Sequence, residues 1–369
     1  MSRKMLSILL ASLMVFTLAF AGCSTAPASS AAPSSSGSGS QPASSEPAAS
    51  EEWVPDKTIT LVVGNAAGGG IDTMARTLAP ALEEYLGVSV VVENMPGASS
   101  GVAAEYVMGQ PKDGYTLFAC SSSICAFSTT ENSDVTYHDM GILAMPFSTH
   151  NPAVLVKADS GINTMEDFIA YVKANPTTAS TAGVGSTWHV PAALLANTLG
   201  CLENVSFIPY DSGKETTLAV ARGEVDWSTC GIYQESSEAI TSGLVKPLAL
   251  VGPDSFNLEG YGEVPSILDS VPELAQYADV LGGWRGFGYA KGTPDNVVAK
   301  LTEALEFAIN SDDFQALLEK NGVADAPILY GADADALYEK SSRIYSWLLY
   351  DLGDSPRSPD ELNVPRYEG

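Results

Sequence analysis

Short runs of β-branched residues alternate along the chain with longer stretches in which apolar residues recur at helical spacing. Residues 58–63 (TITLVV) form the first such run, and apolar side chains then occupy every fourth position from Met74 to Leu86. The first pattern predicts a buried strand and the second a helix with one apolar face. Another strand is predicted at 88–92. Because this alternation brings successive strands into one sheet, we expect an α/β fold with mostly parallel sheets flanked by helices.

The alternation runs through the whole globular part of the chain and starts afresh near Pro152. With roughly 315 globular residues and no second low-complexity stretch, we expect two lobes rather than two independent proteins. The further elements predicted are helices at 102–108, 165–175, 192–199, 214–222 and 295–310, and strands at 115–119, 153–156, 178–182, 205–210, 225–230 and 245–251.

Two glycine-rich loops follow predicted strands and lead into predicted helices. The first is GNAAGGGID at 64–72, and the second is GVGSTWH at 183–189. Without Cβ atoms the backbone can approach a ligand closely, and the free N–H groups of a helix's first turn attract an anion. Two such loops facing each other would hold an anion from both sides. Tight turns without a ligand are the alternative interpretation.

Hydroxyl groups and one imidazole are predicted near the same edge. The strand at 115–119 is followed by Ser121, Ser122 and Ser123, at the carboxyl edge where open α/β sheets bind ligands. A serine cluster at this place serves either as a helix cap or as a ligand contact. His189, one of three histidines, is either a packed neutral ring or a ligand contact.

Residues 1–22 have the pattern of a secretory signal peptide. Two basic residues precede an apolar run at 5–21, and FAGC at 20–23 resembles a bacterial lipobox, in which Cys23 becomes the lipid-modified first residue. An ordinary signal peptide with an incidental cysteine is the alternative. Residues 23–52 are rich in Ser, Ala, Pro and Gly, which predicts a flexible linker. No other segment has the roughly 18 apolar residues that cross a bilayer, so a soluble domain on a lipid tether is expected.

The formal charge of −26, with only 18 Lys and Arg, argues against nucleic acid or an anionic membrane surface as partner. Backbone amides, helix dipoles, hydroxyls and a few basic groups must then hold any anionic ligand. Rossmann, P-loop, nucleophile-elbow and H-E-x-x-H motifs are missing, so no catalytic residue, cofactor or metal is expected. Four cysteines after Cys23 form either two disulfides or buried free thiols: Cys120, Cys125, Cys201 and Cys230.

Several stretches together resemble the receptors of tripartite tricarboxylate transporters, also called Bug receptors. They run in the family's order through almost the whole globular region: AAGGGIDTMAR (66–76), VVVENMPGASSGVAAEYV (90–107), PKDGYTL (111–117), GVGSTWH (183–189), IPYDSG (208–213), RGEVD (222–226) and GWRGFGYAKGTP (283–294). The resemblance implies a two-lobed Venus-flytrap fold of the type II periplasmic-binding-protein class. It places the first lobe at 53–156 and 280–369 and the second at 157–279, with crossings near 151–157 and 251–281.

The resemblance also implies a function. The expected protein is a monomeric extracytoplasmic receptor that binds a small mono-, di- or tricarboxylate and delivers it to a permease with large and small membrane subunits. It would be lipid-anchored at the outer face of the cytoplasmic membrane, or periplasmic. An enzyme using the same cleft and a ligand-sensing surface lipoprotein are the alternatives. The ligand contacts implied by position are Asn65, Ala66, Ala67, Gly68, Gly69, Gly70, Asp72, Ser121, Ser122, Ser123, Gly185, Ser186, Thr187, His189 and Asp226.

Four positions leave the details of binding open. Asp72 is equally suited to capping the first helix. Many family members have Tyr-Lys-Gly where this chain has YDSG at 210–213, so the basic group is missing or is replaced by Lys214. The family often has an Asp a few residues beyond Asp226, but this chain has no acidic residue in that region. Arg285 is the only strong cation in its motif, and it either binds a carboxylate bidentately or ties the hinge.

Overall fold

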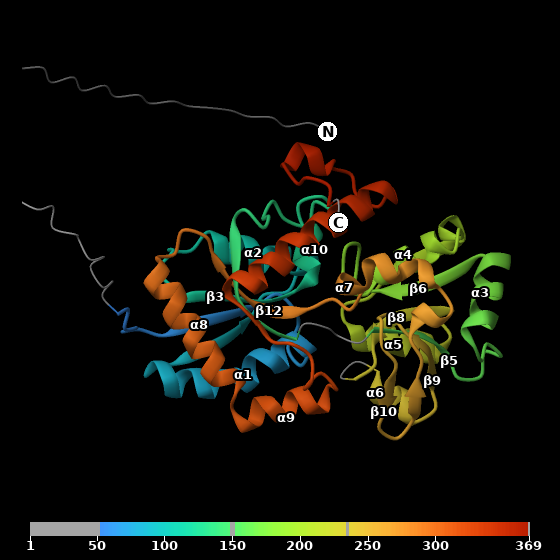
Figure 1. The fold of residues 1–369 in the computed structure, drawn as a ribbon, viewed down its shortest axis with the longest axis horizontal. Helices are drawn as coiled ribbons and strands as arrows, with labels where there is room; N and C mark the ends of the chain where they lie inside the picture. Colours follow the sequence, from blue (N-terminus) through green and yellow to red (C-terminus); the bar gives the residue numbers. More distant parts are fainter. Residues whose placement is uncertain (1–51, 148–151, 234–235, 368–369) are drawn as a thin grey trace, which may run out of the picture. The chain divides into compact units, whose positions relative to one another are not determined.

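The computed structural model describes residues 52–147, 152–233 and 236–367 (Figure 1). The expected signal peptide, the lipidation site Cys23, nearly all of the linker at 23–52 and the start of the first crossing, Asn151, lie outside the described residues. From Ser50 to Gly369 the chain clusters as one unit, and this unit holds two separate main sheets.

The first sheet has six strands: β1 (Ile59–Val63), β2 (Val90–Asn94), β3 (Thr116–Ser121), β4 (Met140–Phe147), β12 (Arg285–Ala290) and β13 (Leu329–Tyr330). Their order across the sheet is β13-β4-β12-β3-β1-β2. β1 is parallel to β2 and β3, because helical crossovers return the chain to the same edge. β12 is antiparallel to β3 and β4, and β13 is antiparallel to β4.

Five helices pack on the first sheet: α1 (Gly70–Leu86), α2 (Gly101–Met108), α8 (Asp295–Ile309), α9 (Asp312–Lys320) and α10 (Gly331–Asp351). α1, α8 and α9 share one hydrophobic core with the sheet, and α2 and α10 share another. α1 buries the predicted apolar stripe from Met74 to Leu86. It ends at Gly87, whose φ of 70° lets its N–H reach the Glu83 carbonyl. The sheet and these helices are the first lobe.

The second sheet has five strands: β5 (Pro152–Lys157), β6 (Thr177–Thr181), β7 (Val205–Pro209), β8 (Trp227–Gly231) and β9 (Val245–Leu250). Their order is β7-β6-β8-β5-β9, with β6 parallel to β7 and β8, and β5 antiparallel to β8 and β9. Because β5 pairs only here, the second lobe begins at Pro152. The expected boundary at residue 157 placed this strand in the wrong lobe.

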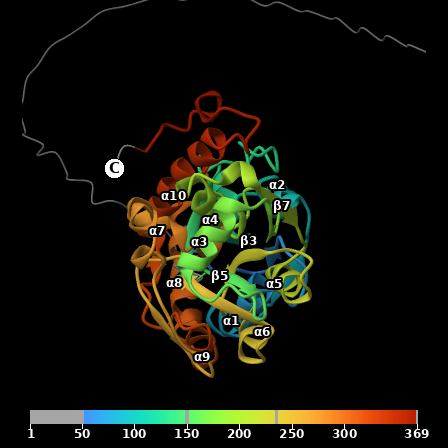
Figure 2. The ribbon, with the colours of Figure 1, turned by 90° about the vertical axis from the view of Figure 1, so that its right-hand side faces the viewer.

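Four helices belong to the second lobe: α3 (Met165–Ala174), α4 (His189–Thr198), α5 (Gly213–Arg222) and α6 (Ser237–Thr241). α3 and α4 contribute to the core on one face of its sheet, and α5 and α6 to the core on the other (Figure 2). A capping box starts α3, in which Thr164 Oγ1 accepts from the Asp167 N–H and Asp167 Oδ2 accepts from the Thr164 N–H.

The connection back to the first lobe runs through a hairpin of β10 (Phe256–Leu258) and β11 (Gly262–Val264) and then α7 (Ala278–Leu281). Val280 and Trp284 pack in a core of the first lobe, whereas Leu281 between them packs in a core of the second. The chain therefore returns to the first lobe within residues 280–284.

The predicted two-lobed α/β fold is confirmed, but the sheets are mixed rather than mostly parallel. Strands that enter late in the chain, such as β12, add to a parallel half in the opposite direction. The four described cysteines are free and buried, so the disulfide alternative is wrong for them. Among the described residues, none of the helices combines the length and apolar character needed to span a bilayer.

Candidate functional site

The first glycine loop lies between the end of β1 and the start of α1, whose N-cap residue is Gly69. Ala66, Ala67 and Gly68, at its tip, are exposed. The N–H groups of Ala66 and Ala67 have no hydrogen-bond acceptor within the described residues. The loop therefore holds backbone donors without a partner among the described residues, at the positive end of a helix dipole.

Asp72 braces this loop from inside. Its side chain is buried, and its oxygens accept from the Gly68 N–H at 2.8 Å, from Arg76 Nε at 2.9 Å and from Asn94 Nδ2 at 2.9 Å. Burial alone would raise the pKa of Asp72, but these hydrogen bonds outweigh it and the pKa is lowered. Both carboxylate oxygens are engaged by the protein, which favours the structural role of Asp72 over contact with a ligand amine.

A buried guanidinium lies against the first turn of α1. Arg285 is the first residue of β12, pairs across the ladder with Ser121, and is only 5% exposed. A Cβ added at Gly70 would lie 2.6 Å from Arg285 Nη1, and the guanidinium also stands 5.5 Å over the ring of Phe147. A fixed cation and the positive end of α1 therefore meet at one place, an arrangement that favours a bound anion.

The segment after β2 contains three consecutive residues with positive φ that are not glycine. Ala98, Ser99 and Ser100 have φ values of 46°, 51° and 85°. Such conformations cost energy for residues with a Cβ and concentrate at functional sites. Ser100 Oγ donates to Asn65 Oδ1 at 3.2 Å, and Ser99 Oγ lies beside Gly183 of the second loop. Sequence reasoning missed this segment, although the Pro-Gly turn before it is visible in the sequence.

The serine cluster after β3 meets the second glycine loop. Ser122 Oγ lies 3.3 Å from Thr187 Oγ1, which in turn donates to Ser121 Oγ at 3.5 Å, and Ser121 Oγ lies 3.0 Å from Ser123 Oγ. All four side chains are buried. The structure thus brings predicted site residues from both lobes into direct contact through hydroxyl groups.

The second loop is also held by its own glycines and by the first lobe. Gly183 and Gly185 have φ values of 97° and 75°, which favour glycine. Asn132 Nδ2 of the first lobe donates to the Val184 carbonyl at 3.3 Å. Ser186 is buried, and its Oγ accepts from the His189 N–H at 3.2 Å at the start of α4.

His189 is a packed ring between the lobes. Its Nδ1 accepts from the Gly185 N–H at 3.2 Å, and its Nε2 lies 3.6 Å from Asp354 Oδ2 in the turn after α10. Burial lowers the pKa of His189 to about 4, and burial raises the pKa of Asp354. The distance alone would suit an ion pair. Because burial favours the uncharged form of the ring, we describe it as a neutral imidazole with its Nε2–H facing Asp354.

Two predicted or candidate residues stand away from this junction. Asp226 precedes β8, at the edge of the sheet opposite to the second loop. Its oxygens accept from Thr178 N and Oγ1 at 2.7 and 2.8 Å and from Tyr171 OH at 3.3 Å. The assignment of Asp226 to the ligand site is therefore wrong in this structure, since it ties β6 and α3 to β8. Lys214 lies exposed in the first turn of α5.

Comparison with known proteins identifies the family. The profile of the tripartite tricarboxylate transporter family receptor matches residues 74–333. A UPF0065 protein from the gbd 5′ region of Cupriavidus necator is 31% identical over 277 residues, which cover 72% of this chain and 79% of the relative.

Solved structures share the fold. MatC from Rhodopseudomonas palustris with bound malate has a TM-score of 0.66 at 22% identity, over 80% of this chain and 99% of that one. The R. palustris protein Rpa4515 with adipate has a TM-score of 0.67 at 22% identity, over 82% and 99%. Two mixed sheets flanked by helices, as found here, are the fold of these binding proteins. The chain therefore belongs to the tripartite tricarboxylate transporter family of receptors.

Proposed function

We propose that this chain is a solute receptor that holds a small carboxylate between its two glycine loops. The observation that carries the proposal is the contact of Ser121 and Ser122 with Thr187, because it gathers hydroxyl donors from both lobes. A carboxylate has up to four lone-pair sites that accept from such donors. Closure of the lobes around the ligand would bury it away from water, where these hydrogen bonds are stronger.

The charges of the site suit an anion although the whole chain is acidic. The N–H groups of the exposed residues Ala66 and Ala67 supply backbone donors, and the guanidinium of Arg285 lies against Gly70 in the adjoining helical turn. A net charge of −26 repels anions at long range, so affinity must come from such fixed local groups.

The ligand class follows from the family together with these donors. Relatives of the same fold hold malate and adipate, which both carry two carboxylates. We infer that one carboxylate is bound at the first loop and that the rest of the ligand meets Gly185, Ser186 and Thr187. His189 supports the second loop from behind, since Gly185 donates to its Nδ1 and Asp354 faces its Nε2.

The cellular role comes from the sequence and the family. We propose that a secretory signal and lipidation at Cys23 place the folded part outside the cytoplasmic membrane as a monomer on a flexible linker. There it would deliver its carboxylate to a permease of one large and one small membrane subunit. An enzyme using this cleft would require an activated nucleophile or an acid/base pair. The candidate nucleophile Ser123 bonds to Ser121, and the two ring nitrogens of His189 face Gly185 and Asp354 instead.

A thermal-shift screen tests the proposal. Purified protein, refolded to remove any carried-over ligand, is heated with malate, adipate, citrate and acetate, and with the diamides of malate and adipate as uncharged controls. We expect at least one carboxylate to raise the midpoint of unfolding and its diamide to leave it unchanged. The proposal would be contradicted if none of the carboxylates raised the midpoint, or if a diamide raised it as much as its carboxylate.

A further inference from the structure

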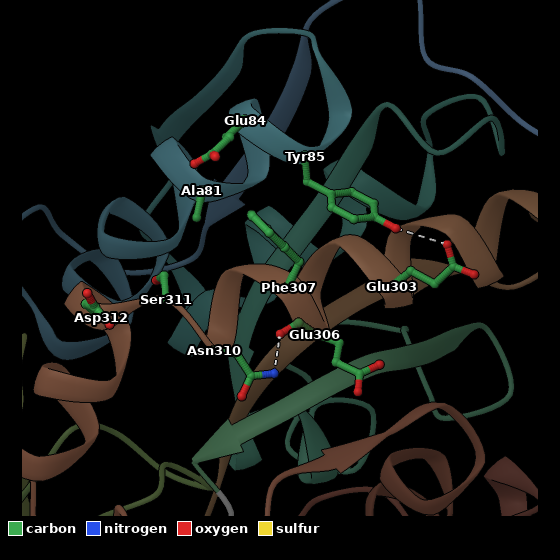
Figure 3. A pocket seen from close by; sticks show the side chains of 9 residues that line it. All are labelled: Ala81, Glu84, Tyr85, Glu303, Glu306, Phe307, Asn310, Ser311 and Asp312. Carbon is green, nitrogen blue, oxygen red and sulfur yellow. Dashed lines mark hydrogen bonds between the residues drawn. The ribbon is translucent and has the colours of Figure 1, made fainter.

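A hollow of about 640 Å³ lies in the first lobe between α1, α8 and the start of α9 (Figure 3). It is separate from the first glycine loop, which stands at the opposite end of α1. Tyr85 projects from the last turns of α1 and Phe307 from α8, with ring centroids 5.2 Å apart. Phe307 is 42% exposed. An aromatic ring left exposed in a concave place is typical of protein contact sites.

The rim of the hollow is negatively charged. Four carboxylates line it, Glu84, Glu303, Glu306 and Asp312, and no basic residue is among the residues that line it. Nearby Lys300 is engaged, since its Nζ lies 2.7 Å from Glu52 and 3.8 Å from Glu303. An aromatic floor with an acidic rim is complementary to a partner with an apolar side chain flanked by Lys or Arg.

The charge of the chain itself decides between possible occupants. Residues 24–51, the linker outside the described structure, carry no Lys or Arg and include Glu46 and Glu51, so the rim would repel them. A second copy of the chain brings a net charge of −26, and an anionic lipid surface is also of the wrong sign. A basic segment of another protein remains the occupant that the charges favour.

The position of the linker favours a membrane protein. Glu52 is the first described residue, and its side chain accepts a hydrogen bond from Lys300. Lys300 lies one turn of α8 before Glu303, which is on the rim. The linker therefore joins the folded part close to the hollow, and a tether to the membrane would keep this side of the first lobe near membrane partners. We propose that the hollow between α1 and α8 is the docking site for a basic extracytoplasmic segment of a membrane protein. This step rests on the proposed delivery to a permease.

Site-directed photo-crosslinking in membranes of the source organism tests the docking site. The described cysteines are buried, so a Phe307→Cys substitution in the full-length, membrane-tethered chain offers an exposed thiol for benzophenone maleimide. Tyr261→Cys, 43% exposed in the β10–β11 hairpin of the second lobe, is the matched control position. We expect the Phe307→Cys probe to form an adduct whose partner peptide, identified by mass spectrometry, comes from an integral membrane protein and contains Lys or Arg.

Charge reversal then tests the rim. Glu84→Lys with Glu306→Lys should lower the adduct yield about tenfold, whereas Asp254→Lys with Glu259→Lys on the second lobe should leave it unchanged. An adduct with a second copy or with the chain's own linker, a yield no higher than from Tyr261→Cys, or a yield that ignores charge reversal would overturn the docking site. Calorimetry of the purified variants with the carboxylate from the thermal screen separates the two proposals, because carboxylate affinity should be the same in all of them.

Discussion

The Nε2 atom of His189 in the second lobe lies 3.6 Å from Oδ2 of Asp354, which follows the long helix α10 of the first. Val190, the next residue of α4, packs in the same core as Tyr345 and Leu349 of α10. The start of α4 is thus joined to the first lobe by a buried polar contact and by apolar packing. This contact lies next to the second glycine loop, because the Gly185 N–H donates to the other ring nitrogen of His189.

Stability should fall as the pH drops from about 6.5 towards 4. The pKa of His189 is lowered to about 4 by burial, so between these values the unfolded chain binds a proton that the folded chain does not. The pKa of Asp354 is raised by burial, so at pH values just above its ordinary pKa of 3.8 the folded chain keeps a proton that the unfolded chain has lost. This opposes the effect of His189 on stability. We expect the His189 effect to cost about 2 kcal/mol between pH 7 and 5, measured by urea unfolding.

Substitution identifies the source of this pH dependence. His189→Gln should flatten the fall in unfolding free energy between pH 7 and 5, whereas His138→Gln, at an exposed position, should not. An unchanged slope in the His189→Gln protein would show that other groups control the acid response.

A bulky residue at Gly69 should abolish ligand binding and leave the fold intact. Gly69 has φ −76°, which any residue adopts, and an added Cβ would meet only the Ala66 carbonyl, at 3.3 Å. A phenylalanine ring in the loop would occupy space intended for the ligand, so we expect Gly69→Phe to weaken carboxylate binding about a hundredfold in calorimetry. Gly252→Phe, where an added Cβ meets nothing within 4 Å, is the control. Equal affinity in the two proteins would place the ligand elsewhere.

Arg285 should contribute to affinity and not only to the connection between lobes. Its guanidinium lies against Gly70, so Arg285→Gln removes a buried cation at the start of α1. We expect carboxylate affinity to fall about tenfold to a hundredfold, with partial recovery in Arg285→Lys. Arg357→Gln, which loses a surface pair with Asp134, is the control. Loss of stability without loss of affinity would support the hinge role alone.

The hydroxyl of Thr187 should be needed for binding. Thr187→Val keeps the shape of the side chain and removes the group that contacts Ser121 and Ser122. We expect about a tenfold loss of carboxylate affinity, the value of one hydrogen bond to a charged group. Thr293→Val removes a buried hydroxyl that donates to the Ala290 carbonyl and should change stability without changing affinity.

The sequence was informative where structure depends on local pattern. The stripe from Met74 to Leu86 and the β-branched run before it predicted α1 and β1 because both depend on neighbouring residues. Strand direction in the sheets was not predictable, because β12 pairs with β3 across more than 150 residues of chain. The fold class could be recognised from sequence, and the exact pairing could not.

The candidate site shows the same division. The glycine loops were visible as short motifs, and the structure places both at the junction of the lobes. Asp226 was expected within the strand at 225–230 and among the contacts implied by the resemblance, but in the structure it precedes β8 and bonds to Thr178 at the other edge of the sheet. The contact of Arg285 with Gly70 and the strained backbone at Ser99 depend on long-range packing, for which the local sequence carries no signal.

The most direct test of the account is a crystal structure with the carboxylate that gives the largest thermal shift. We expect the ligand to lie between the lobes, with carboxylate oxygens within hydrogen-bond distance of the Ala66 or Ala67 N–H and of the Thr187 hydroxyl. Density for the ligand that contacts one lobe only, or that lies away from both glycine loops, would contradict the central claim that the two loops together form the carboxylate site.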